Sequence, residues 1–178
     1  MNLNINFSAY SEILTDRLIL RFLTPSDNQS IFAIRSNPKI AKHLDRSLYN
    51  SITEADNFIT KISNGITNNE WLYWGLCLPV NNEVIGTICL WQFDGNFTSA
   101  DIGYELIPKF QGKGYIQEAI TAVINFAFTE LKLKSLSAEV AMDNIKSVRI
   151  LKKFGFNYVY DEADNAQIYE LQNNNFEL

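Results

Sequence analysis

A glycine-rich segment at 111–119, QGKGYIQEA, offers the clearest chemistry in this chain. It follows an apolar, strand-like run from Ile102 to Leu106 that Pro108 interrupts, and it leads directly into a helix with apolar residues at helical spacing. The first amides of a helix have no partner within the helix, and the helix dipole makes that end positive. Glycine lets the main chain approach a ligand closely because it has no Cβ. The segment therefore predicts an anion pocket that suits a phosphate-bearing cofactor.

The composition is that of one folded domain. The chain has 178 residues, of which 47% are hydrophobic and 20% are charged, and its formal net charge is −5. A nucleic-acid binder usually carries a basic face, so an acidic chain disfavours that class and we expect no nucleic-acid partner. The N-terminus lacks a basic segment followed by an apolar one, and no apolar run approaches the length of a membrane span. We therefore expect a cytoplasmic protein without a membrane partner.

Metal chemistry is not indicated by the cysteines or the single histidine. Cys77 and Cys89 lie in adjacent strand-like runs, with Cys77 expected opposite about Gly86 and Cys89 opposite about Trp74. We expect two free, buried thiols in a reducing compartment. His43 has no metal-ligand spacing around it, so we expect no metal cofactor.

The order of the elements predicts a single α+β domain around a mixed sheet. Residues 1–14 are expected to be partly loose and residues 15–178 to form the domain. The first half should hold a strand at 17–23, a helix from Thr24-Pro25 to about Pro38, an irregular stretch at 39–50, and a helix that Ser51 or Thr53 caps and that Asn64-Gly65 ends. The second half should hold strands at 71–78, 83–91 and 98–106, a long helix from 111, a strand at 135–141, a helix at 144–154, and strands at 157–160 and 167–171.

Three segments resemble a known family when they are taken together. They are TDRLILR at 15–21, IGYEL at 102–106 followed by QGKG at 111–114, and NIKSVRILKKFGF at 144–156. They are similar to the entry strand, the central strand with its cofactor loop, and the second signature of the GNAT acetyltransferase superfamily, in its ribosomal-protein N-acetyltransferase (RimJ/RimL-like) branch. The resemblance implies a GNAT-like α+β domain flanked by about four helices, with a mixed, mostly antiparallel sheet that splays between its fourth and fifth strands. Acetyl-CoA would lie in that gap and donate its acetyl group directly to a primary amine.

The resemblance also implies a set of cofactor-binding residues. The main-chain amides of the loop and helix start would cradle the pyrophosphate, Leu106 would contact the thioester end, and Asn144 would contact the pantetheine arm. The implied set is Leu106, Gln111, Gly112, Lys113, Gly114, Tyr115, Ile116 and Asn144. The alternative for the glycines is an ordinary tight turn, and for Lys113 and Lys109 a solvated surface charge is an equal alternative. The family usually has glycine or alanine where this chain has Ile116, and a bulky residue there could shift the helix start or weaken the cofactor contact.

The amine that accepts the acetyl group must lose a proton, because amines with a pKa of roughly 8 to 10 are mostly protonated at neutral pH. Strand alternation places Asp101, Gly103 and Glu105 on one face and apolar side chains on the other. Glu105 is our candidate base, acting through a water, and the alternative is a solvent-exposed strand carboxylate. Asp101 and Glu118 are weaker candidates, since Glu118 is already explained by its favourable place at a helix N-terminus.

The leaving thiolate needs a hydrogen-bond donor. Ser147 shares a helix face with Asn144, so its hydroxyl is our candidate donor to the sulfur. Helix capping is the alternative role for both residues, and Asn144 could do both. The amide of Leu106 at the strand end could stabilise the oxyanion.

The acceptor remains open between a protein N-terminus, a polyamine and an aminoglycoside-like amine. Its pocket should come from residues 39–50 and the second helix, with Trp91 and Phe93 nearby, while His43 is expected to be an ordinary surface residue. A homodimer is common in the branch that the chain resembles. Two other functions stay open: a non-catalytic acetyl-CoA sensor, suggested by Ile116, and an interaction module that uses the fold without a cofactor.

Overall fold

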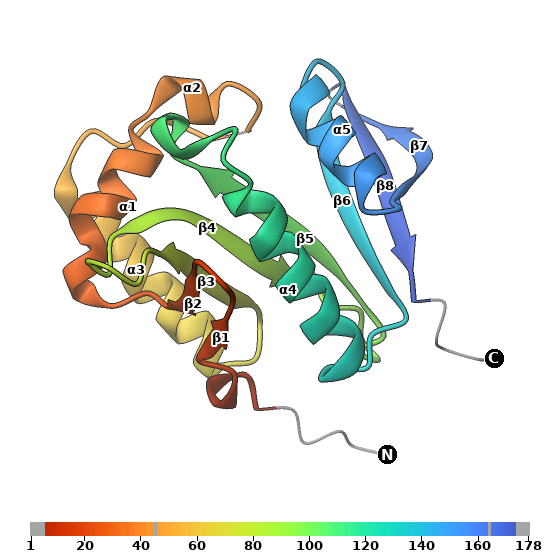
Figure 1. The fold of residues 1–178 in the computed structure, drawn as a ribbon, viewed down its shortest axis with the longest axis horizontal. Helices are drawn as coiled ribbons and strands as arrows, with labels where there is room; N and C mark the ends of the chain where they lie inside the picture. The colour runs from red at the N-terminus through yellow and green to blue at the C-terminus, as the bar shows by residue number, and fades with distance from the viewer. Residues whose placement is uncertain (1–5, 45, 164, 174–178) are drawn as a thin grey trace.

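A computed structural model describes residues 6–44, 46–163 and 165–173 (Figure 1). Eight strands form one sheet in the order β1-β2-β3-β4-β5-β6-β8-β7. The strands are β1 Glu12–Leu14, β2 Ile19–Phe22, β3 Leu72–Cys77, β4 Val84–Trp91, β5 Ser99–Leu106, β6 Ser135–Ala141, β7 Asn157–Glu162 and β8 Ala166–Gln172. The helices are α1 Asn28–Arg35, α2 Pro38–Ala41, α3 Ile52–Thr67, α4 Tyr115–Thr129 and α5 Ile145–Lys153, with short 3₁₀ turns at Phe7–Ala9, Pro25–Asp27 and Pro108–Phe110. The predicted mixed α+β sheet is confirmed.

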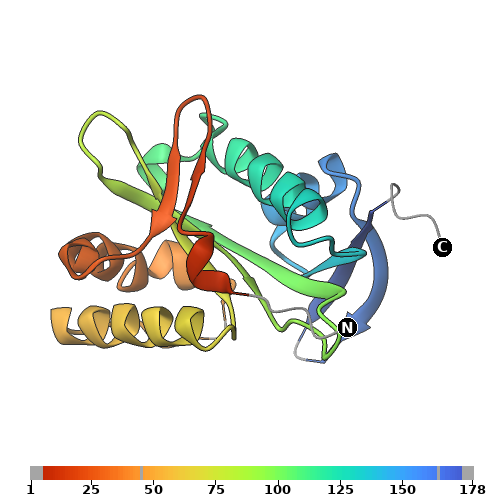
Figure 2. The same cartoon turned by 90° about the horizontal axis from the view of Figure 1, so that it is seen from below.

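The helices cover both faces of the sheet. Helices α1 and α3 pack on one face and α4 lies on the other, as Figure 2 shows from below. The apolar core is continuous through these layers and includes the fully buried Trp74, Leu76 and Ile88 of the central strands. Strand β3 is buried at every position, which is why its sequence shows no polar alternation.

The sheet opens between β5 and β6. These two strands are parallel and pair only from Ser99 to Asp101 on β5 and from Ser135 to Ser137 on β6, whereas the other neighbouring strands are antiparallel. Strand β5 then continues to Leu106 paired with β4 alone. Figure 1 shows the two strands diverging toward the end where α2 and α5 face each other. The expected splay is therefore confirmed, because β5 and β6 are the fourth and fifth of the strands predicted from sequence.

Two local predictions need correction. Helix α3 begins with the predicted Ser51 cap, reinforced by the Glu54 carboxylate, but it passes through Gly65 and ends at Thr67. Gly65 is required by packing, since a Cβ there would come within 2.0 Å of the Trp71 ring. The hairpin also pairs differently from expectation: Cys77 lies opposite Val84 and not Gly86, and Cys89 lies opposite Tyr73 and not Trp74, with a register shift between Leu76 and Cys77.

The N-terminal segment has regular structure where it is described. Residues 1–5 lie outside the described part, but Phe7 is fully buried and β1 pairs with β2. The two cysteines are free thiols, as expected. None of the helices in the described ranges is both long and apolar enough to cross a membrane.

Candidate active site

The end of β5 is the centre of the candidate site, because its two faces carry different chemistry. Ile102 and Leu106 are buried toward the core, whereas Glu105 points to the face covered by α1, where its carboxylate meets Arg35. The alternation expected from sequence is confirmed.

The open edge of β5 offers main-chain groups to that gap. The amide of Ile107 donates to the carbonyl of Ile85 on β4, at 2.9 Å. Since neighbouring residues of a strand point their amides to opposite sides, the amide of Leu106 points away from β4 toward the gap. Gln111 fixes the strand end, because its side-chain amide donates to the Leu106 carbonyl at 3.1 Å.

The glycine loop has the geometry of an anion cradle. Gly112 and Gly114 adopt positive φ values of 77° and 84°, and Gly114 is the N-cap residue of α4. Within the part of the chain that the structure describes, the amides of Gly112, Gly114, Tyr115 and Ile116 donate to no protein acceptor. A Cβ on Gly112 would meet no protein atom within 4 Å, so the space above this glycine is open. The loop therefore fits a pyrophosphate group.

The side chains of this loop have separate roles. Ile116 packs against the apolar core, so its bulk is accommodated inside the protein while its amide stays at the helix start. Tyr115 lies under the guanidinium of Arg17, at 4.7 Å from ring centroid to Cζ. Lys109 pairs with Glu83 at 3.0 Å, whereas the Lys113 ammonium forms no ion pair among the described residues and lies 5.7 Å from the Phe110 ring. Lys113 is the better placed of the two lysines to contact a phosphate.

Arg17 was not recognised from sequence as part of the site. Its Nε donates to Glu118 at 2.7 Å and its Nη1 donates to the Lys113 carbonyl at 2.9 Å. Thr15 donates to the other Glu118 oxygen at 2.6 Å. Partial burial raises the pKa of Glu118, but the hydrogen bonds from Thr15 and Arg17 outweigh burial and lower the pKa overall. Glu118 is thus a structural anchor that holds the start of α4 against the turn between β1 and β2, and the TDRL motif was the available signal in the sequence.

Helix α5 brings two further predicted residues to the same region. Asn144 is its N-cap, and its Oδ1 accepts a hydrogen bond from the Ser147 amide at 3.2 Å. This confirms the capping role, and the Asn144 side-chain NH2 has no partner among the described residues, so that it can donate to a ligand. Helix α5 is tied to α4 by Lys153, whose ammonium donates to Gln117 at 2.5 Å.

Tyr104 brings a second hydroxyl to this region, besides that of Ser147. From the sequence we expected Tyr104 only as part of the apolar face of its strand. Its hydroxyl oxygen is buried and has no hydrogen-bond partner among the described residues. Burial raises the pKa of the Tyr104 hydroxyl, and the nearby Ser147 hydroxyl partly opposes that effect. Ser147 and Tyr104 thus bring two hydroxyls to the α5 side of the gap.

Glu105 is held by two arginines. Its Oε1 lies 3.4 Å from Arg35 Nη1 and its Oε2 lies 2.9 Å from Arg46 Nη2. The carboxylate side chain is only 13% exposed, so it is not the solvent-exposed strand carboxylate of the alternative interpretation. Each carboxylate oxygen keeps a further lone pair for a water or an amine.

The other carboxylate on this face, Asp101, lies at the closed end of the gap. Burial, and then the charge of Glu139 on β6, raise the pKa of Asp101 to about 6. The thiols are poor nucleophiles, because burial raises the pKa of Cys77 to about 11, while burial followed by the Glu105 charge raises that of Cys89 to about 12. These values favour direct transfer over a covalent acetyl-cysteine.

The acceptor-pocket predictions are partly corrected. Phe93 packs on Phe7, with ring centroids 4.8 Å apart, and belongs to an aromatic cluster of the core. Trp91 is 41% exposed and lies opposite Asp101, near the closed end of the gap. His43 is not an isolated surface residue, because its Nδ1 lies 2.8 Å from the Asp143 carboxylate across the open end. Among residues 6–44, 46–163 and 165–173, no group of three or more histidine, cysteine or acidic side chains could hold a metal ion.

Comparisons with known proteins agree with this geometry. The profile of the acetyltransferase (GNAT) domain family matches residues 17–157. The chain is 34% identical over 142 residues to the uncharacterized N-acetyltransferase YoaA of Bacillus subtilis, covering 80% of each chain.

Solved structures show the same fold. A spermidine N-acetyltransferase from Vibrio cholerae, in complex with CoA and spermine, has a TM-score of 0.78 at 22% identity and covers 89% of this chain and 96% of its own. A ribosomal-protein-S5-alanine acetyltransferase from Vibrio fischeri has a TM-score of 0.81 at 17% identity and covers 94% and 99%. The chain therefore belongs to the GNAT acetyltransferase family, as an N-acetyltransferase that uses acetyl-CoA.

Proposed function

We propose that this protein transfers an acetyl group from acetyl-CoA to a primary amine in one step, within a ternary complex. The observation that carries the proposal is the arrangement around β5. The loop with free amides lies beyond the end of the strand, the open edge of the strand lies along the gap, and Glu105 lies on the face opposite to α4. The acetyl donor and the amine can therefore meet at the strand end from opposite sides.

Main-chain groups and α5 bind the acetyl donor, acetyl-CoA. The amides of Gly112, Gly114, Tyr115 and Ile116 donate to the pyrophosphate, with the positive end of α4 behind them. The Leu106 amide donates to the thioester oxygen as negative charge develops there, and preorganised donors of this kind contribute strongly to catalysis.

A side-chain hydroxyl stabilises the sulfur that leaves as a thiolate. Ser147 donates a hydrogen bond to the thiolate, while the side-chain NH2 of its capping partner Asn144 donates to the pantetheine arm. A serine hydroxyl is too weak an acid to give up its proton at neutral pH, so its contribution is hydrogen bonding to the thiolate.

Glu105 acts as the base for the acceptor amine. It accepts the proton of the ammonium, through a water, so that the neutral amine attacks the thioester carbonyl. The acceptor is a protein N-terminal amine or a small-molecule amine, and relatives of both kinds exist in the family: one acetylates spermidine and another an alanine of a ribosomal protein, by their names.

The substitution Glu105→Gln tests this role. It keeps the shape of the side chain, and we expect kcat to fall about 100-fold or more while acetyl-CoA affinity changes little. Because Glu105 also binds two arginines, the pH dependence of kcat is the decisive measurement. Loss of the rising limb of the profile supports the base. A higher KM for the acceptor with an unchanged kcat profile would assign Glu105 to positioning of the arginines alone.

A further inference from the structure

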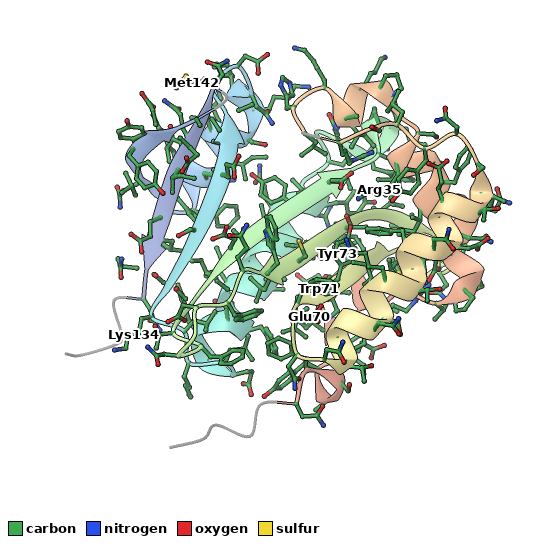
Figure 3. All side chains as sticks on the ribbon, turned by 180° about the vertical axis from the view of Figure 1, so that it is seen from behind. Arg35, Glu70, Trp71, Tyr73, Lys134 and Met142 are labelled. Carbon is green, nitrogen blue, oxygen red and sulfur yellow. The ribbon has the colours of Figure 1, made fainter. Side chains whose placement is uncertain are left out.

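Arg35 is a buried guanidinium on the acceptor side of the sheet. It is the last residue of α1, and its side chain is only 15% exposed. Its Cζ lies 4.2 Å from the ring centroid of Phe58 and 5.1 Å from that of Tyr49. Figure 3 shows it beside the sheet, on the side of α1 and α3. The two rings fix the plane of the guanidinium and exclude water from it.

The hydrogen bonding of Arg35 is incomplete. A guanidinium has five N–H donors, yet among the described residues this one makes a single long side-chain hydrogen bond of 3.4 Å, to Glu105 Oε1. Its Nε is buried and meets no acceptor among the described residues. An unpaired donor in such a place costs free energy, and more so on a charged group. A buried guanidinium left in this condition is suited to receive an anion.

Arg46 resembles Arg35 in contacting Glu105 and in having a buried Nε that meets no acceptor among the described residues, but its terminal nitrogens make more hydrogen bonds. Arg46 donates to the carbonyls of Arg35 and Ile34 as well as to Glu105, at 2.8, 3.5 and 2.9 Å. These bonds fasten the segment before α3 to the C-terminus of α1, so packing and capping account for Arg46. They do not account for Arg35.

Among the described residues, the side chains that meet at Glu105 carry a net positive charge. Among the described residues, two guanidiniums share the one carboxylate of Glu105. Asp101 lies on the same face of β5, in the part of the strand that pairs with β6 at the closed end of the gap. Asp101 is four residues from Glu105 along β5, or about 13 Å, so it does not pair with the two arginines that hold Glu105.

We infer that Arg35 binds an anionic group of the acyl acceptor, so that the acceptor is an amine with a carboxylate or phosphate close to its amino group. The inference rests on the proposed function, since it concerns the acceptor of that same site. Arg35 lies within 3.4 Å of the proposed base, so the anionic group must lie within a few bonds of the reacting nitrogen, as it does in an α-amino acid. A polyamine would instead place additional positive charge near two guanidiniums and is disfavoured.

Matched acceptors test the inference. The purified protein is given acetyl-CoA and pairs that differ only in charge, namely several amino acids and their carboxamides, together with phosphoserine, ethanolamine phosphate and spermidine. We expect kcat/KM for acceptors with an anionic group to exceed that of their neutral counterparts by about 10- to 100-fold, as the loss of a charge-assisted hydrogen bond predicts. The amino acid and phosphate arms show which anion is preferred.

Variants separate recognition from folding. Arg35→Met should abolish the preference by lowering kcat/KM for anionic acceptors more than for their neutral counterparts, with the KM for acetyl-CoA unchanged, and Arg35→Lys should retain part of the preference with the charge. Lys61→Gln is the matched control, because it removes one positive charge from the exposed side of α3. Melting curves with saturating acetyl-CoA give a second measurement, in which an amino acid should raise Tm more than its amide does.

Three results with matched acids and amides would overturn the inference, and a fourth comes from spermidine. They are equal kcat/KM for acids and amides in the wild type, an equal loss for both in Arg35→Met, or equal Tm shifts for both. If acetyl-CoA neither binds nor releases CoA with any acceptor, the proposed function fails instead. Turnover with spermidine at the level of the best amino acid would leave the proposed function standing and refute the role of Arg35.

Discussion

Substituting Gly112 by alanine tests the cofactor loop most directly. The φ of Gly112 is 77°, a conformation that costs an alanine about 1 to 2 kcal/mol, whereas the new methyl group meets no protein atom. For a domain of this size the cost corresponds to a loss of about 2 to 8 °C in Tm. In the absence of a ligand the variant should therefore fold and melt slightly early.

The effect on acetyl-CoA should be larger and of a different origin. The methyl group enters the open space above the loop, so a phosphate can no longer approach the amides to hydrogen-bond distance. Loss of one charge-assisted hydrogen bond costs about 1.5 to 3 kcal/mol, so we expect the dissociation constant to rise at least tenfold.

Calorimetric titration and ligand-dependent melting measure this effect. At acetyl-CoA concentrations 100-fold above the wild-type dissociation constant, the wild type gains about 2.7 kcal/mol, and a tenfold weaker variant gains about 1.4 kcal/mol. Gly155→Ala is the matched control, because Gly155 has φ 84° and only an ordinary contact with Leu171 at 3.5 Å. Similar dissociation constants for the two variants would refute the placement of the pyrophosphate at this loop.

Two further predictions concern stability. Because the pKa of Asp101 is raised from 3.8 to about 6, the folded protein holds this proton more tightly, and its stability falls as pH rises from about 4 to 6. The difference corresponds to about 3 kcal/mol, and to about 1 to 2 kcal/mol once the partial exposure of the carboxyl is allowed for. Urea unfolding should therefore show Asp101→Asn more stable than the wild type by that amount at pH 8 and equal to it at pH 4; equal stability at both pH values would contradict the raised pKa. Gly65→Ala should lose about 2 to 4 kcal/mol, because its Cβ would displace the Trp71 ring and break the bond from that indole to the Ile62 carbonyl, and an unchanged urea midpoint would show that the ring moves freely.

Local sequence determined the elements and the chemistry that depends on them. The glycine turn, the start of α4, the Ser51 cap and the alternation along β5 each depend on residues a few positions apart, so they could be read without a fold. The same holds for Asn144 and Ser147, whose spacing of three places both on one turn of α5. The family resemblance added the splayed sheet, which local patterns alone do not specify.

Tertiary structure decided what surrounds those elements. Arg35 and Arg46 reach Glu105 from 70 and 59 residues away, and no local pattern marks which charges will meet. Gly65 was expected to end a helix, but the indole six residues later sets its identity through packing. The hairpin closes with Leu78 bonded to Glu83, and a register shift after Leu76 follows, so the position of the turn residues alone could not fix the pairing. The sequence by itself therefore determined that this protein binds a phosphate-bearing donor, because that binding depends on contiguous main-chain amides. The charge around Glu105 was decided by the fold alone, because it is assembled from residues that lie far apart in the chain.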